Sequence, residues 1–407
     1  MKSTIHINQR LSLSERLIVV FLLVLSFENI IEYYSGSKIG IAVLIYRIIA
    51  AGYAVFCFFL CVRSKYKRNS YSTAELLLFI FIFMWSVLCL LFHGVEKDFF
   101  TGVIYFGILA GGILTQKRFE IWERLLSVIP YLGVAVMVLM IATQHIDLTV
   151  AIRRGYVWTN IFFWGGIYWA LIPVVLYSFL NRKKRGVAVA YWICGIIFNL
   201  IFLKRFIIVD SALLLFMVLY ILYKENRSGG SRLTRIGVFI LCIGLTACFL
   251  LQNSFLYELT KQMFQRMDFL SSIWKFDRVI ESRSYFCNES FIYTLLGRGF
   301  WGAHSTLGTL NPALHIGWSN FIFKGGIALF ILAVFPVIKS YKSLFKLEHY
   351  DRKYKFAVCC VVIYSVKLLY VNLHRFEPEL ILFFWACTVI MEKTGKKIME
   401  NANSEQI

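Results

Sequence analysis

Long apolar runs dominate this sequence and limit what the chain can fold into. Eleven stretches approach the length of about 20 mostly apolar residues that a helix needs to span a bilayer. They are 17–34, 39–62, 75–93, 99–115, 124–142, 158–180, 187–203, 206–223, 235–252, 318–338 and 356–373. A twelfth run, 379–392, is shorter and suits a re-entrant or tilted segment as well as a full span. Because backbone groups in a bilayer must pair within each span, we predict an all-α, polytopic bundle of about 12 transmembrane helices.

Composition supports the membrane class and a single domain. The 407 residues are 59% hydrophobic and 16% charged, whereas soluble domains are about 45–50% apolar and about 25% charged. A soluble core could not hide this much apolar surface. The sequence has five prolines, no low-complexity tract and no clear internal repeat, so we predict one membrane domain over 1–407.

The net charge of +20 comes from short basic clusters between the apolar runs rather than from one soluble face. We therefore exclude nucleic acid as a partner and apply the positive-inside rule, which places Lys and Arg on the cytoplasmic side. With both termini cytoplasmic, the inside segments hold 27 of the 43 Lys and Arg residues. These segments are 1–16, 63–74, 116–124, 181–186, 224–235, 339–355 and 393–407.

This topology leaves 253–317 as one long extracytoplasmic loop. From Ser254 to about Phe286, apolar residues recur at three-to-four spacing, which predicts a helix packed on the mouth of the bundle. The second half begins with a glycine-rich turn at 295–302 and continues as polar sequence to His315. Long loops without much regular structure are more often functional than idle, so we expect the chemistry of the protein here.

Short motifs in and beside this loop resemble a known family. They are Arg283, Leu295-Leu296-Gly297-Arg298-Gly299, His315 and Gly325-Gly326-Ile327, preceded in the chain by Leu203-Lys204-Arg205-Phe206. The arrangement resembles the O-antigen polymerase and O-antigen ligase superfamily of bacterial polysaccharide assembly, as does the layout of spans with a large late loop. The resemblance implies a membrane fold of the GT-C type.

Two residues depart from the commoner pattern of that superfamily. Ile316 follows His315 where Asn is frequent, and Lys204 precedes Arg205 where Ser is frequent. Both departures weaken the ligase interpretation more than the polymerase one. We therefore expect a polymerase of O-antigen or capsular repeat units, with an O-antigen ligase as the first alternative.

The resemblance implies transfer of a glycan from an undecaprenyl-pyrophosphate carrier to a hydroxyl of an acceptor sugar. Negative charge grows on the departing pyrophosphate, and the sequence has no Asp-x-Asp that would hold a divalent metal there. We therefore predict no cofactor and no metal. Arg205 and Arg283 are assigned to the leaving group, because a guanidinium matches phosphate oxygens. His315 is the predicted general base, since histidine titrates near neutral pH.

Seven further residues are predicted to contact the substrate through charge, stacking or hydrogen bonds. They are Arg298, Lys324, Arg153, Arg154, Tyr285, Trp301 and His304. His304 is also the competitor of His315 for the role of base. Three cations within apolar runs, Arg47, Lys324 and Lys367, need a cavity or a partner at their depth, and an internal ion pair is the preferred explanation for Lys324.

Structural roles compete with these assignments. Arg205 fits an interfacial anchor that snorkels outwards. Arg283 fits a loop charge paired with Glu281 or Glu289, and His315 fits a residue bonded to a backbone carbonyl at the start of a helix.

Two other functional classes remain open. A lipid-linked oligosaccharide flippase also has about twelve spans, but transporters tend to show two related halves, which are not visible here. A scaffold of a polysaccharide export complex would make the loop cations coincidental. The enzyme interpretation predicts a multi-pass protein of the bacterial inner membrane with a periplasmic loop. Its partners are the lipid-linked oligosaccharide as donor and acceptor, the lipid bilayer and a chain-length regulator protein.

Overall fold

Helices make up most of the described chain, as the apolar runs predicted. The computed structural model describes residues 13–26, 119–143, 170–181, 184–201, 206–225, 277–299, 302, 304–306, 309–311, 314–370 and 378–404, with single residues between 45 and 92. The helices are α1 (Leu13–Ser26), α6 (Phe119–Thr143), α9 (Leu171–Leu180), α10 (Arg185–Ile201), α11 (Phe206–Glu225), α14 (Asp277–Asn288), α15 (Phe291–Leu296), α16 (Gly317–Leu344), α17 (Arg352–Lys367) and α18 (Pro378–Ser404), with a 3-10 turn η4 (Leu347–His349). Within these ranges, the departure from an all-α fold is an antiparallel hairpin of β1 (His304–Thr306) and β2 (Thr309–Asn311).

The described helices follow the predicted runs closely. Runs that coincide with helices or lie mostly within them are 124–142, 187–203, 206–223, 318–338 and 379–392. Run 356–373 overshoots, because α17 ends at Lys367 and the chain then turns through Leu368. Within the described ranges, α16 is the one helix both long and apolar enough to cross a membrane. Runs 99–115 and 235–252 lie wholly outside the described residues, as do most of 39–62 and more than half of 75–93.

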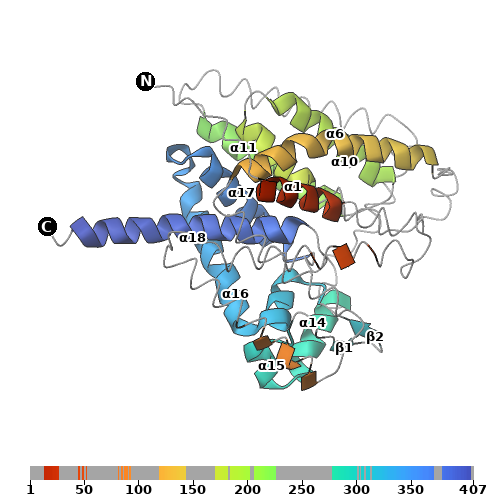
Figure 1. The fold of residues 1–407 in the computed structure, drawn as a ribbon, viewed down its shortest axis with the longest axis vertical. Helices are drawn as coiled ribbons and strands as arrows, with labels where there is room; N and C mark the ends of the chain where they lie inside the picture. The colour runs from red at the N-terminus through yellow and green to blue at the C-terminus, as the bar shows by residue number, and fades with distance from the viewer. Residues whose placement is uncertain are drawn as a thin grey trace.

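An aromatic cluster packs α6, α17 and α18 against one another. The ring of Trp385 stacks on Phe119, with centroids 5.8 Å apart, and contacts Trp122 and Phe356 at 5.9 and 6.0 Å. All four side chains are buried. Such ring pairs add about 0.5–1.5 kcal/mol each beyond the burial of their surface. The helices that this cluster holds together are far apart in the sequence, as the colours of α6, α17 and α18 show (Figure 1).

Ion pairs tie several helix ends together at one end of the bundle, which we call the basic end. The pairs are Arg352–Glu123, Lys224–Glu348 (3.7 Å) and Lys393–Asp351 (3.9 Å). Lys224 also donates a hydrogen bond to the carbonyl of Phe345, at 3.0 Å, just past the end of α16. Parts of four predicted cytoplasmic segments, 116–124, 224–235, 339–355 and 393–407, therefore gather at the same end of the molecule.

A buried polar network joins α11, α17 and α18 at the opposite end, which we call the loop end. Lys367 Nζ lies 2.6 Å from Glu379 Oε1 and 3.6 Å from Asp210 Oδ2. The hydroxyl of Tyr370 donates to Asp210, and the guanidinium of Arg278 in α14 donates to the Tyr370 carbonyl. Lys367, for which the sequence predicted a cavity or a partner, thus has ion-pair partners inside the bundle. The network also fastens the loop helix α14 to the bundle.

The helix α16 is broken at Gly326, and the glycine-rich turn after α15 fills the break. Gly326 has φ 63° and ψ −163°, a conformation that is essentially restricted to glycine. The backbone N–H groups of Arg298 and Gly299 donate to the carbonyls of Phe323 and Lys324, at 2.6 and 3.1 Å. A Cβ on Gly326 would overlap the carbonyl of Leu295. The two glycine motifs, far apart in sequence, therefore interlock backbone to backbone.

Replacing Gly326 with Ala should lower the thermal unfolding midpoint in detergent, measured by intrinsic fluorescence. Strain at such a backbone conformation is worth about 1–3 kcal/mol, and the overlap with Leu295 adds to it. Gly186→Ala in α10 is the control, because nothing lies within 4 Å of a Cβ there and Ala is the better helix former. Equal midpoints for the two variants would contradict the interlock.

Candidate active site at the mouth of α16

His315 lies two residues before α16 and is held by a carboxylate from the loop helix α14. Glu281 Oε2 accepts a hydrogen bond from the backbone N–H of His315 at 2.9 Å and lies 2.9 Å from its ring nitrogen Nδ1. The Glu281 side chain is 5% exposed, whereas that of His315 is 50% exposed. The carboxylate is therefore fixed from two directions, and the imidazole that it holds faces out of the protein surface.

This pair has the chemistry of an oriented base. With Nδ1 donating its proton to Glu281, the other ring nitrogen, Nε2, carries the lone pair that can accept a proton. Burial raises the pKa of Glu281, but the hydrogen bonds from the ring and backbone of His315 outweigh burial and hold the pKa below its usual 4.5. Glu281 is therefore ionised at neutral pH and stabilises the imidazolium that forms when Nε2 takes up a proton.

Sequence reasoning had placed Glu281 only as an ion-pair partner of Arg283. In the structure, Glu281 binds His315 instead. The sequence had suggested a backbone carbonyl as the partner of His315. The sequence signal that Glu281 faces inward was its four-residue spacing from Tyr285, which puts both side chains on one face of a helix. Both are buried on that face.

Arg283 lies on a different face of α14 from the Glu281–His315 pair. Successive helical residues turn by about 100°, so the two residues from Glu281 to Arg283 place them on nearly opposite sides. Arg283 lines a surface pocket of about 380 Å³, whose other lining residues are Val279, Ile280, Ser284, Cys287 and Asn288. The pocket has apolar walls and one guanidinium, and His315 does not line it.

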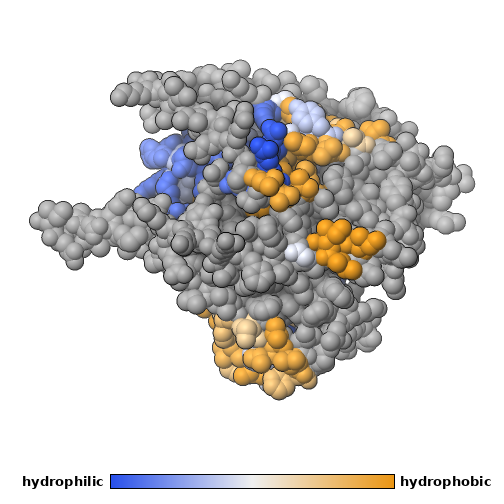
Figure 2. Space-filling model, in the orientation of Figure 1, coloured by the Kyte–Doolittle hydropathy of each residue, from blue (hydrophilic) through white to orange (hydrophobic). Residues whose placement is uncertain are grey.

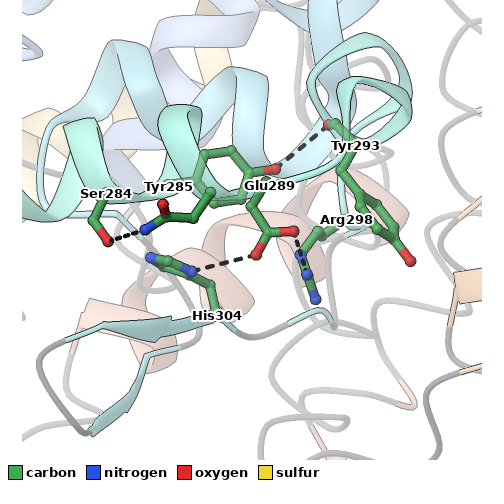
Figure 3. Close-up of polar contacts among 7 residues, drawn as sticks. Ser284, Tyr285, Glu289, Tyr293, Arg298 and His304 are labelled. Carbon is green, nitrogen blue, oxygen red and sulfur yellow. Dashed lines mark hydrogen bonds and ion pairs between the residues drawn. The ribbon is translucent and has the colours of Figure 1, made fainter.

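A second polar cluster lies on the inner side of α14 and α15 (Figure 3). The guanidinium of Arg298 donates to Glu289 Oε2, and its carbon lies 4.5 Å from the ring centroid of Tyr293. The other oxygen, Oε1, is 3.6 Å from His304 Nδ1. Arg298, predicted to contact phosphate, is thus an ion-paired residue that holds the glycine-rich turn against α14.

The rings of Tyr285 and His304 belong to the core of the loop. Tyr285 meets His304 and Phe323 edge to face, with both pairs of centroids 5.1 Å apart. Its side chain is fully buried, so the ring has no free face for the sugar stacking predicted from sequence. Burial lowers the pKa of His304 below its usual 6.5, and the nearby Glu289 carboxylate only partly opposes this. His304 is therefore neutral at pH 7.

Lys324 is buried in α16 and points to the same turn. Its Nζ donates to the carbonyl of Gly302 at 3.3 Å and lies 4.9 Å from the ring centroid of Phe323. Four predicted site residues lie outside the described part of the chain: Arg205, Arg153, Arg154 and Trp301. Arg205 directly precedes α11, in which Asp210 joins the network at the loop end.

Two further observations bear on the chemistry. Within the described ranges, no group of three or more His, Cys, Asp or Glu side chains is arranged to hold a metal ion. Comparisons with protein-family models, with curated proteins and with solved structures find no match to this chain.

Glu281→Gln should flatten the acid side of the stability profile. Because the pKa of Glu281 is lower in the folded than in the unfolded protein, its contribution to stability is present above about pH 4.5 and is lost as pH falls through the folded value. Thermal midpoints of wild type and variant, measured from pH 7 to pH 3, should converge towards low pH. Parallel curves would contradict the assigned ionisation.

Proposed function

We propose that this chain is a glycosyltransferase of the bacterial inner membrane that joins undecaprenyl-pyrophosphate-linked oligosaccharide repeat units into O-antigen or capsular polysaccharide. It has about twelve spans, cytoplasmic termini and a periplasmic loop at 253–317. Support for this topology comes from α16, which is apolar enough to span a bilayer, and from the gathering of predicted cytoplasmic segments at the basic end. The Glu281–His315 pair belongs to the loop end.

The observation that carries the proposal is the hydrogen-bonded Glu281–His315 pair at the mouth of α16. In the proposed reaction, the hydroxyl oxygen of the acceptor sugar bonds to the anomeric carbon of the donor. The bond from that carbon to the pyrophosphate oxygen breaks, and its electron pair leaves with the pyrophosphate. The hydroxyl proton passes to Nε2 of His315, and ionised Glu281 stabilises the resulting imidazolium.

Arg283 is assigned to the departing pyrophosphate. An isoprenoid diphosphate has an apolar chain and an anionic head, and the pocket beside Arg283 combines apolar walls with one guanidinium. The helix α14 is about 10–12 Å across with its side chains. The Arg283 pocket lies on one side of this helix, and His315 contacts the other side through Glu281. Arg205 is the proposed second cation. Fixed guanidinium groups then supply the charge stabilisation that a metal ion provides in other glycosyltransferases.

His315→Ala should slow glycan elongation by about 10²–10⁴-fold, the usual contribution of a general base. The assay supplies a synthetic undecaprenyl-pyrophosphate repeat unit to purified protein without divalent metal and follows the ladder of longer glycans. His349→Ala is the control, because that histidine is exposed and lies next to Glu348 at the basic end. A His315→Ala enzyme as active as the control would remove the proposed base.

Arg283→Ala should abolish the ladder without shifting the thermal midpoint, because the exposed side chain contributes charge rather than core packing. Arg283→Lys should retain part of the activity, since it keeps the charge and loses the planar fork. Arg124→Ala, another exposed arginine, serves as the matched control. A full ladder from Arg283→Ala, or a ladder that needs a divalent ion, would contradict the assigned stabilisation of the leaving group.

A further inference from the structure

The loop helix α15 exposes a cluster of large apolar side chains. Phe291, Ile292 and Leu295 are 74%, 47% and 41% exposed. Figure 2 shows an apolar patch at the foot of the molecule, where Figure 1 places α15. Contiguous apolar surface of this kind marks a site that another apolar phase covers.

The helix α16 carries a matching exposed stripe along its length. Ile327, Ile331, Phe335 and Ile338 are all exposed. Their spacing of four, four and three residues places them on one face of the helix. On a helix that spans a bilayer, such a face lies against the lipid chains.

The patch on α15 continues this stripe. The carbonyl of Leu295 lies directly against Gly326, the residue before Ile327, so the end of α15 meets the Ile327 end of the stripe. The backbone bonds from Arg298 and Gly299 to α16 fix the depth of α15 relative to that helix. Trp85 adds a third fastening, because its indole N–H donates to the Gly297 carbonyl at 2.6 Å.

Charged side chains near the patch are paired with one another and mostly buried. Arg298 and Glu289 bind each other, with side chains only 19% and 15% exposed. Glu281 is buried against His315. The α15 patch is therefore an apolar face backed by paired charges, as expected of a short amphipathic helix that lies in a membrane interface.

We propose that α15 lies in the outer interfacial layer of the bilayer, with Phe291, Ile292 and Leu295 in contact with lipid acyl chains. This inference rests on the membrane-spanning part of the proposed function and not on its chemistry. Because α14 ends three residues before α15 begins, the α15 contact also fixes the position of α14 relative to the bilayer. It thereby holds the Glu281–His315 pair and the Arg283 pocket at the level where the phosphates of a lipid-linked substrate lie.

The experiment places 4-trifluoromethyl-phenylalanine at position 291 in the full-length protein, reconstituted in vesicles of phosphatidylethanolamine and phosphatidylglycerol. The fluorine NMR signal is then broadened either by 5-doxyl phosphatidylcholine in the bilayer or by a gadolinium chelate in the water on both sides. The same label at Phe335 on the α16 stripe reports lipid, and at exposed His349 it reports water. The label at Ile292 is the second variant if Phe291 does not tolerate it.

The proposal predicts that the doxyl lipid broadens the signal from position 291 more than the chelate does, as at position 335. Stronger broadening by the chelate would place α15 in water. Protection from both reagents would show that a second copy or another protein covers the patch. Either of these results overturns the inference, while lipid contact at position 335 leaves the membrane-spanning part of the proposed function standing. Absence of lipid contact at position 335 overturns both.

Discussion

The interlock between the glycine-rich turn and the broken helix α16 is the contact on which the loop end of the molecule depends. Three glycines with positive φ, Gly297, Gly299 and Gly326, let two backbones approach closely enough to hydrogen-bond. A Cβ on Gly297 would lie only 2.6 Å from the backbone nitrogen of Gly326. This contact anchors α15 on α16, and α14 immediately precedes α15. The position of the Glu281–His315 pair thus follows from a backbone fit that side chains would prevent.

The charged groups of the loop and of the first half of α16 fall into two sets, one buried in ion pairs or hydrogen bonds and one exposed. Arg298 and Lys324 face inward, where Arg298 binds Glu289 and Lys324 binds the Gly302 carbonyl, so both stabilise the glycine-rich turn. His315 and Arg283 face outward from two sides of α14. The buried ion pair of Lys367 and Glu379 joins α17 to α18 in the bundle. This division shows how a strongly basic chain can use some of its cations to stabilise a loop and still leave Arg283 at the surface.

The sequence predicted the features that depend on local pattern. Apolar runs located α6, α10, α11 and α16, and the glycine motif at 295–302 located the turn, because these signals are carried by consecutive residues. The break of α16 at Gly326 was not predicted. The hairpin of β1 and β2 was not predicted, since three-residue strands are too short to show alternation. The pairing of residues far apart in the chain could not be predicted from the sequence either. Glu281 binds a residue 34 positions away, Glu289 neutralises Arg298, and the ring of Tyr285 is enclosed by His304 and Phe323. Only the fold decides which carboxylate meets which cation.

The central claim is that Glu281 fixes His315 with its proton on Nδ1 and leaves Nε2 as the base. Nitrogen NMR of histidine-labelled protein at pH 8 tests it most directly, with the His315 signals assigned by their loss in His315→Gln. The account predicts the Nδ1–H tautomer in the wild type, and loss of that preference in Glu281→Gln. A wild-type His315 that carries its proton on Nε2 would contradict the account, because its outward-facing nitrogen could then not accept a proton from a sugar hydroxyl.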